Sequence, residues 1–255
     1  MSAPSIYRWA GDGLARADSA ASAASAIVAA DSWLVADALV LALGLHRGRF
    51  LPHALRVSAD AEQFWDAAIA TIPRSGEWFP RVEVHSNSEL IMRLRPAPPR
   101  ERSVAVATWT GAEPRTVPMV KGPDLERMAE IRAVVQPAGA GEAILLSTEG
   151  YVVEGAYSGL LWWRGEILCG PLTEFDRVDS VTTRSVLTLA RALGFDTHEE
   201  AVTPSELDGV ELWALSALHG IRIVTSWVDG PSLAEQPGRL ASWRARLDAL
   251  RRPLP

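Results

Sequence analysis

Apolar and polar residues alternate in many short stretches of this chain, with the period of two that is typical of half-buried strands. In the first half, the pattern predicts strands at 80–84, 89–95 and 103–109, and the apolar run 27–45 predicts a pair of buried strands. In the second half, it predicts a series of short strands at 142–148, 151–156, 159–165, 166–171, 210–216 and 221–227. We expect turns at Glu149-Gly150 and Arg164-Gly165.

Apolar residues recur at helical spacing in four other regions. They predict one or two helices over 50–72 and single helices over about 123–135, 181–194 and 238–251. Pro123 is expected at the first helical position of its helix, with Asp124 and Glu126 near the positive end of the dipole. The helix from 181 is expected to have threonine at its start and glycine at its end. The Ala/Ser-rich residues 17–30 are interpreted as a turn or a short helix.

This mixture of helices and strands indicates an α/β (α+β) fold. Residues 110–118 are rich in turn-forming residues, and we place a domain junction there. The predicted domains are a smaller one of residues 1–115 and a larger one of residues 119–255.

Composition limits the possible partners and the compartment. A net charge of −6 argues against nonspecific binding to nucleic acid. The single Cys169 excludes an internal disulfide and suits a reducing compartment such as the cytoplasm, where an inert core position is expected for it. Residues 27–45 are long enough to suggest a membrane span, but Asp31 and Asp37 within them would be costly in lipid. Neither a membrane span nor a secretory signal is expected.

Common catalytic motifs do not occur. A G-x-S-x-G pattern fails at Ser158 because Ala156 stands in the place of the first glycine. The glycine-rich residues 139–144 follow a predicted helix and precede a predicted strand, the reverse of a dinucleotide site. The five histidines are scattered, so no metal site is expected.

Lys121 is the only lysine among 25 basic residues, the other 24 being arginine. Lysine forms an imine with a carbonyl compound and arginine does not. Glu154 follows 33 residues later, and a helix that begins with hydroxyl residues near 181 could bind a phosphate. These three features suit pyridoxal phosphate: the lysine amine can bind its aldehyde, the glutamate can pair with its ring nitrogen, and the helix start can bind its phosphate. A lysine retained by chance is the alternative interpretation.

From Lys121 onward the chain resembles the class IV aminotransferases, the fold-type IV group of pyridoxal phosphate enzymes. The matching features are Lys121 ahead of a helix, Glu142 before a strand, "GYVVE" (150–154), "VTTR" (181–184) where the family has G-I-T-R, and "SALHGIRIV" (216–224). The spacing from Lys121 to Glu154 resembles that of 4-amino-4-deoxychorismate lyase. The resemblance implies a small N-terminal α/β domain, a larger C-terminal β-rich pseudo-barrel domain, a cofactor cleft between them, and a homodimer.

The resemblance also implies a role for individual residues. Lys121 would hold the cofactor aldehyde as an imine and shuttle protons at the substrate Cα, and Glu154 would pair with the pyridine nitrogen. In the N-terminal half, "HRGRF" (46–50) resembles the family's H-L-x-R-L, which makes Arg49 the phosphate candidate; "HALRV" (53–57) also fits that spacing. The other phosphate candidates are Thr182, Thr183, Ser216 and Ala217. The candidates for substrate contact are Arg95, Ser32 and His219. For Arg95 the preferred interpretation is a solvated residue at a strand end, and for His219 it is a structural role.

Some positions depart from the family pattern. Gly159 stands where the family usually has Asn, Val181 where it has Gly, and "ADSWLVAD" (30–37) where it has a GDG-x-F pattern. Glu126 stands five residues after Lys121, where branched-chain enzymes carry Tyr, which argues against a branched-chain enzyme. The leading hypothesis is therefore a lyase acting on a small amino-acid-like molecule. The alternatives are a class IV transaminase, of the D-amino-acid type or of a specialised pathway, and a cofactor-free binding protein on the same fold.

Overall fold

The computed structural model describes residues 5–18 and 25–255, which fold into two compact units. Unit 1 comprises the described residues of Met1–Pro99, together with Val120–Pro123 and Leu250–Pro255. Unit 2 comprises Arg100–Met119 and Asp124–Ala249. The segment that contains Lys121 therefore belongs to unit 1, although unit 2 flanks it on both sides in the sequence.

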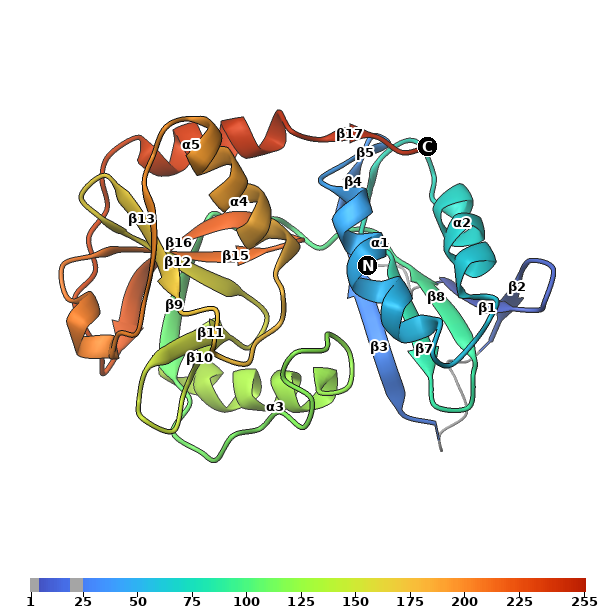
Figure 1. Ribbon diagram of the computed structural model, residues 1–255, viewed down its shortest axis with the longest axis horizontal. Coiled ribbons are helices and arrows are strands. Elements are labelled where there is room, and N and C mark those ends of the chain that lie inside the picture. The colour runs from blue at the N-terminus through green and yellow to red at the C-terminus, as the bar shows by residue number, and fades with distance from the viewer. Residues whose placement is uncertain (1–4, 19–24) are drawn as a thin grey trace. The chain divides into compact units, whose positions relative to one another are not determined.

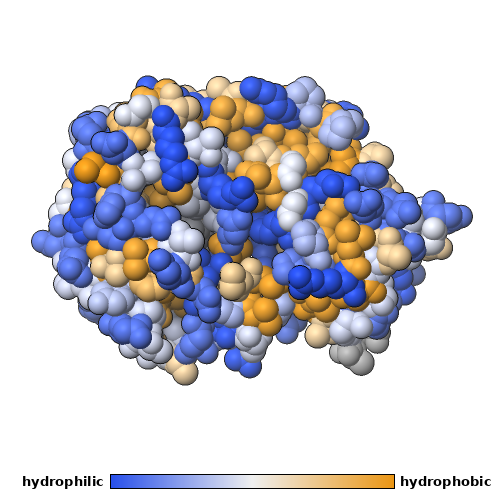
Figure 2. Space-filling model, in the orientation of Figure 1, coloured by the Kyte–Doolittle hydropathy of each residue, from blue (hydrophilic) through white to orange (hydrophobic). Residues whose placement is uncertain are grey.

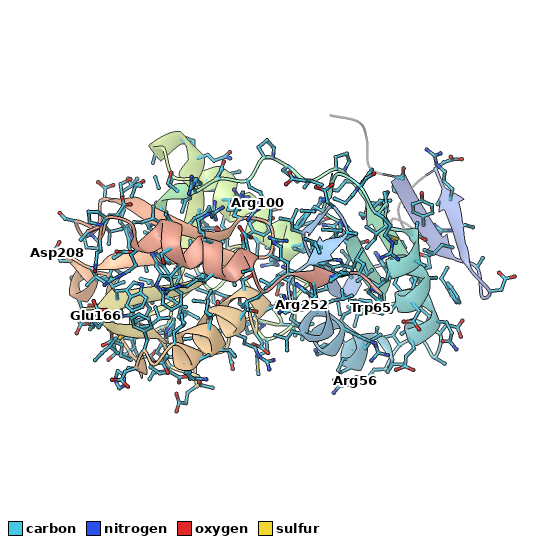
Figure 3. The ribbon with its side chains drawn as sticks, turned by 90° about the horizontal axis from the view of Figure 1, so that it is seen from above. Arg56, Trp65, Arg100, Glu166, Asp208 and Arg252 are labelled. Carbon is cyan, nitrogen blue, oxygen red and sulfur yellow. The ribbon has the colours of Figure 1, made fainter. Side chains whose placement is uncertain are left out.

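The described residues of unit 1 form two antiparallel sheets and the helices α1 and α2, which Figure 1 labels. The five-stranded sheet has the order β2-β1-β8-β7-β3 and the small one the order β17-β5-β4-β6. The strands are β1 Ser5–Trp9, β2 Leu14–Ala17, β3 Ile27–Ser32, β4 Val35–Ala36, β5 Leu39–Val40, β6 Glu77–Trp78, β7 Arg81–His85, β8 Leu90–Leu94 and β17 Arg252–Pro253. Helices α1 Leu43–Ala54 and α2 Ala61–Thr71 bury their apolar residues in the same core as the five-stranded sheet. Trp65 of α2, labelled in Figure 3, packs there on Trp33, with 5.0 Å between ring centroids.

Unit 2 is built on one sheet of eight strands with the order β11-β10-β9-β16-β15-β12-β13-β14. These strands are β9 Ser103–Thr108, β10 Glu142–Leu146, β11 Val152–Gly155, β12 Gly159–Arg164, β13 Ile167–Pro171, β14 Thr197–Glu200, β15 Glu211–Ser216 and β16 Gly220–Val228. β9 pairs in parallel with both β10 and β16, and β13 in parallel with β14, while the other pairs are antiparallel. The helices are α3 Leu125–Val135, α4 Val181–Ala192 and α5 Arg239–Asp248, with short 3-10 turns at Gln136–Ala138 and Pro204–Leu207.

The strands of unit 2 use their two faces differently. Val106, Ile144 and Trp162 share one apolar core on one face of the sheet. Their neighbours in sequence, such as Ala107 and Ala143, pack under α3 instead. Because successive side chains of a strand point to opposite faces, both faces of these strands are covered by protein. This explains why their sequences are almost continuously apolar, as in "GLLWWR".

The predicted mixture of helices and strands is confirmed, and the predicted strands and helices from residue 80 onward are all present. Some details of the predictions were wrong. Pro123 precedes the N-cap residue Asp124 instead of opening α3. Helix α4 has the predicted threonines, Thr182 and Thr183, in its first turn, and Ser180 is its N-cap. Strands β1, β2, β6, β14 and β17 were not predicted. Part of the proposed turn or helix at 17–30 lies outside the described residues, and its end, from Ile27, belongs to β3.

The chain passes from unit 1 to unit 2 between Pro99 and Arg100, earlier than the junction proposed at 110–118. The physical reason is β9, which pairs with β10 and β16 and is therefore part of the larger sheet. Within the described ranges, no helix has both the length and the apolar character needed to cross a membrane. The face drawn in Figure 2 shows hydrophilic side chains mixed with smaller hydrophobic areas.

Candidate active site

Lys121 lies in a loop whose two ends are joined by a hydrogen-bonded carboxylate. Asp124, the N-cap residue of α3, accepts hydrogen bonds from the Thr116 hydroxyl (2.7 Å) and from the backbone N–H groups of Thr116 (3.0 Å) and Val117 (3.1 Å). Burial alone would raise the pKa of Asp124, but these hydrogen bonds lower it below its usual value. The loop is thus closed by an ionised side chain three residues after Lys121.

The backbone at Lys121 is fixed against β3. The carbonyl oxygen of Lys121 accepts a hydrogen bond of 2.7 Å from the N–H of Ala30. Gly122 has a φ of +134°, and a Cβ atom there would lie 2.5 Å from the Ala30 nitrogen. Only glycine permits this approach, so the main chain that carries the half-buried Lys121 has one defined position within unit 1.

Arg49, the predicted phosphate residue, lies on α1 beside a buried aspartate. Its Nε and Nη2 atoms donate to the two carboxylate oxygens of Asp31 at 2.8 and 2.7 Å, and His46 Nδ1 lies 3.0 Å from the same carboxylate. Asp31 is fully buried; burial opposes its ionisation, but Arg49 and His46 hold its pKa far below the usual range. Ser32 donates its N–H to Asp31 at 2.6 Å. The structure therefore brings Arg49 and Ser32 together around Asp31, which in the sequence served only as an argument against a membrane span.

Arg95, a predicted substrate contact, is engaged locally in unit 1. Its Nε donates to the Phe79 carbonyl at 3.1 Å, and its guanidinium carbon lies 5.0 Å from the centre of the Phe79 ring. These are the contacts of a strand-end arginine that supports its own sheet.

Glu154, near the end of β11, is a buried acid with an arginine partner. Its side chain is 8% exposed, and Arg115 Nη1 donates to Oε1 at 2.5 Å. Burial raises the pKa of Glu154 to about 7, against the opposing effects of Arg115, the Val178 N–H and Arg177. Arg115 also donates to both oxygens of Glu113, at 2.8 and 2.7 Å, and to the Asp176 carbonyl at 2.9 Å. Arg115 was missed in the sequence because it lies in the turn-rich stretch interpreted as a domain junction.

The start of α4 combines a side-chain cap with a crowded hydroxyl. Ser180 Oγ accepts the Thr183 N–H at 3.2 Å, so the N–H groups of the two residues before Thr183 remain available at the positive end of the helix. Thr182 is 2% exposed. The Thr183 hydroxyl is buried, has no hydrogen-bond partner among the described residues, and lies 2.3 Å from where a Cβ atom on Gly159 would be. Gly159, the departure from the family's Asn, therefore leaves the space that Thr183 occupies.

The turn between β15 and β16 contains the remaining predicted residues. Ser216 Oγ accepts the N–H of His219 at 3.3 Å, and Ala217 lies between them. His219 Nδ1 accepts the N–H of Glu101 at 3.0 Å, a bond that requires this nitrogen to be unprotonated. Burial and the nearby arginines, Arg222 first among them, lower the pKa of His219 to about 4. These contacts are those of a neutral structural histidine.

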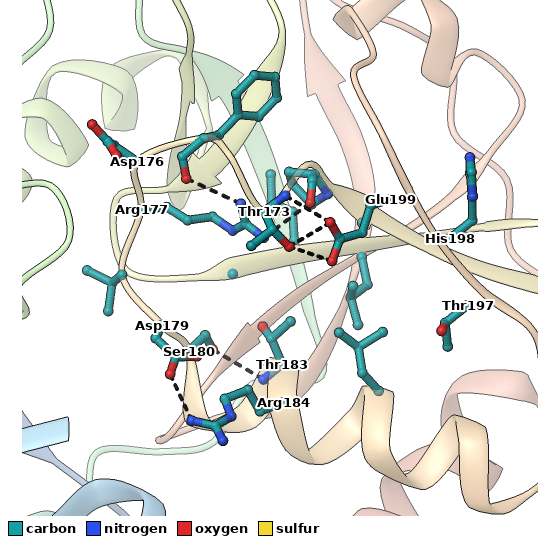
Figure 4. A pocket seen from close by; sticks show the side chains of 18 of the residues that line it. Thr173, Asp176, Arg177, Asp179, Ser180, Thr183, Arg184, Thr197, His198 and Glu199 are labelled. Atoms are coloured by element: carbon teal, nitrogen blue, oxygen red, sulfur yellow. Dashed lines mark hydrogen bonds and ion pairs between the residues drawn. The ribbon is translucent and has the colours of Figure 1, made fainter. Parts of the chain in front are cut away.

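A pocket of about 560 Å³ lies beside the start of α4, within the volume range of small-molecule sites (Figure 4). Its lining includes Ser180 and Thr183 but neither Glu154 nor Thr182. Several of its charged groups are engaged by protein: Arg184 binds Asp179 at 2.9 Å, Glu199 accepts from Thr173, and the guanidinium of Arg177 is bound to three backbone carbonyls. The pocket borders the predicted phosphate region without containing the predicted ring partner.

The residues present fit pyridoxal phosphate. A ring nitrogen requires a carboxylate shielded from water, and Glu154 is one. A phosphate requires N–H and hydroxyl donors, and the start of α4 supplies both. The aldehyde requires an amine, and Lys121 is the only side chain of that kind in the sequence. Glu154 and α4 belong to unit 2, where the carboxyl group of Glu154 meets the N–H of Val178, two residues before the cap of α4.

The comparisons with known proteins agree with this chemistry. The family model described as amino-transferase class IV matches residues 29–227. A search among curated proteins found no match to the chain. The chain is similar to a fold IV-transaminase from Curtobacterium pusillum, with a TM-score of 0.78, 18% identity, and coverage of 96% of this chain and 97% of that one. It is also similar to a hypothetical aminotransferase from Mycobacterium tuberculosis in its PLP-bound form, with a TM-score of 0.77, 18% identity, and coverage of 97% and 98%. A branched-chain aminotransferase from Thermoproteus uzoniensis matches with a TM-score of 0.80, 18% identity, and coverage of 98% and 100%. At these identities the structures establish the fold, and the fold-type IV prediction is confirmed.

Proposed function

The chain belongs to the class IV amino-transferase family, and on that premise we propose that it is a lyase that transfers protons at the Cα of a small amino-acid-like substrate, in the manner of 4-amino-4-deoxychorismate lyase. Membership identifies the chain as an enzyme and pyridoxal phosphate as its cofactor. When bound, pyridoxal phosphate supplies an electron-withdrawing ring that acidifies the Cα–H bond of an amino substrate. A homodimer in the cytoplasm is part of the proposal.

The buried pair Glu154–Arg115 is the observation that carries the proposal. A carboxylate that accepts the N–H of a pyridine ring must be ionised, and burial alone opposes this. Burial raises the pKa of Glu154 to about 7, and Arg115, which donates to Glu154 at 2.5 Å, opposes this rise together with Arg177, so the carboxyl group can ionise near neutral pH. Because the two oxygens of Glu154 are distinct, one can accept from Arg115 while the other accepts from the ring.

Lys121 is assigned to the amine and proton-transfer role. Its carbonyl group is held by Ala30, so the side chain starts from a fixed point. An arginine at this position would keep its proton at every physiological pH and could neither bond to the aldehyde nor move a proton at Cα.

The phosphate is assigned to the start of α4 and to Arg49. The candidate donors are the hydroxyl groups of Thr182 and Thr183 and the first N–H groups of the helix. The Thr183 N–H is bonded to Ser180, but its hydroxyl has no partner among the described residues. Ser216 and Ala217 would add backbone N–H groups. Arg49 is pre-oriented by the bidentate contact with Asp31.

A class IV transaminase is the second candidate function, and the similar solved structures, all called transaminases or aminotransferases, favour it. Against the branched-chain type, Glu126 is exposed in the first turn of α3, where the resemblance calls for a tyrosine packed on the cofactor. A cofactor-free binding protein on this fold is the remaining alternative.

The stoichiometry of keto-acid release separates a lyase from a transaminase. The protein loaded with pyridoxal phosphate would be incubated with 4-amino-4-deoxychorismate, and in parallel with single D- and L-amino acids, in the absence of any amino acceptor. A lyase releases many equivalents of pyruvate per chain from the first and none from the others. A burst that stops at one equivalent of keto acid from an amino acid would show a transaminase instead. A protein that takes up no cofactor would support the binding-protein reading.

A further inference from the structure

A second group of buried charges lies in unit 2, outside the residues assigned to cofactor binding. Glu142 at the start of β10 is 1% exposed, and Arg222 on β16 is 3% exposed. Ser158 Oγ donates to Glu142 Oε2 at 2.6 Å. Nη2 of Arg222 lies 3.1 Å from Ser158 Oγ and 3.4 Å from Glu142 Oε2. The three side chains form one hydrogen-bonded cluster.

This cluster holds the turn Gly155–Ser158, which joins β11 to β12 and begins directly after Glu154. Glu142 Oε1 lies within 3.3 Å of the Tyr157 N–H, and the Ala156 N–H donates to the Ala143 carbonyl at 2.9 Å. A Cβ atom on Gly155 would lie 3.1 Å from Glu142 Cγ. The carboxylate of Glu142 therefore binds the third and fourth residues of the turn, and its side chain leaves little room for a Cβ atom at the first.

Arg222 extends the same cluster toward a second turn. It lies two residues after Gly220, which pairs with Ser216 and closes the turn between β15 and β16. Its Nη1 also donates to Glu101 at 3.3 Å. One guanidinium thus links the turn that follows Glu154 to the strand that leads away from Ser216 and Ala217.

We propose that Glu142 and Arg222 are positioning residues that hold the turn Gly155–Ser158, and through it the Glu154 carboxyl group, where a cofactor ring nitrogen can reach it; the inference rests on the function proposed above. Well-packed apolar side chains generally stabilise a fold as well as a buried ion pair does. What an ion pair adds is direction, because each hydrogen bond fixes the angle as well as the distance of its partner. Here both oxygens of Glu142 are directed at one short turn.

The test compares Glu142→Gln with Glu211→Gln. Glu211 is also a buried glutamate of unit 2, 4% exposed, but its partners are the Trp213 indole and the Gln236 N–H. In the cofactor-free protein, we expect E142Q to speed amide hydrogen exchange at Ala156 and Tyr157 at least tenfold, and E211Q to leave these amides within twofold of wild type. In titrations with pyridoxal phosphate, E142Q should raise the dissociation constant at least tenfold and shift the pH midpoint of binding, which E211Q should not move.

Equal exchange at the turn in the two variants, or an unshifted pH midpoint in E142Q, would overturn the positioning role. If E142Q does not fold, Ser158→Ala, which removes only one hydroxyl group from the cluster, is held to the same comparison with E211Q. If the wild-type protein binds no pyridoxal phosphate, the proposed function fails, while the exchange rates still decide whether the cluster holds the turn.

Discussion

At the scale of single residues, Glu154 predicts a specific dependence of stability on pH. Burial raises its pKa from 4.5 to about 7, so the folded cofactor-free chain retains a proton that the unfolded chain loses. The resulting stabilisation is complete below pH 4.5 and is lost as the pH rises through about 7. Glu154→Gln cannot ionise, so its free energy of unfolding relative to wild type should rise across this range, by up to about 1.4 kcal/mol per pH unit. Urea unfolding of both proteins at several pH values measures the difference.

Glu83 provides a control of opposite sign. This glutamate is buried on β7; burial would raise its pKa, but hydrogen bonds from His85 and Arg93 lower it to about 2. The stabilisation from Glu83 is therefore present above pH 4.5 and is lost as the pH falls through about 2. A flat difference between Glu154→Gln and wild type from pH 4.5 to 8, with Glu83→Gln showing its own trend at low pH, would contradict the account of Glu154.

At the scale of elements, the contact between β12 and α4 predicts an energetic coupling. A Cβ atom on Gly159 would lie 2.3 Å from the Thr183 hydroxyl and 3.2 Å from Ser180 Cβ. Gly159→Ala should therefore destabilise the protein by about 1–3 kcal/mol through overpacking. In a Thr183→Ala background the same change should cost less, because the nearer clash is gone, with a coupling of at least about 0.5 kcal/mol. Equal costs in the two backgrounds, measured by denaturant midpoints, would show that Thr183 does not occupy this space.

The elements themselves were largely predictable from the sequence, because most of them follow simple apolar periodicity. The strands at 142–146, 159–164 and 211–216 are bounded by turn residues and are apolar on both faces, so their ends were clear. Strand β14, "THEE", was missed because it lies at the sheet edge and has no apolar residue to bury. Helix α1 was expected to begin near residue 50 but begins at Leu43. Its start was missed because the N-cap residue, Ala42, has a left-handed backbone and is not one of the residue types that usually mark a helix start.

At the scale of the whole chain, candidate site residues could be proposed from the sequence where residue type suggests a role, but not where a role depends on contacts between distant segments. Lys121 was identifiable because no other residue is a lysine, and Glu154 because it lies in a distinctive turn and strand. Arg115 and Asp31 were not identifiable in the sequence as partners of the candidate residues Glu154 and Arg49. Their roles depend on partners 39 and 18 residues away, Glu154 and Arg49, which periodicity does not reveal. The division into units also depended on such long-range pairing, through β9.

We propose that Lys121 forms the covalent link to pyridoxal phosphate, and chemical trapping can test this role. The purified protein would be incubated with pyridoxal phosphate, reduced with borohydride, digested and mapped by mass spectrometry. Lys121→Arg, which keeps the positive charge, is the matched control. We expect one phosphopyridoxyl group per chain, on the peptide that contains Lys121, and none in the variant. A modified amine elsewhere with Lys121 unmodified, or equal labelling of wild type and Lys121→Arg, would contradict it.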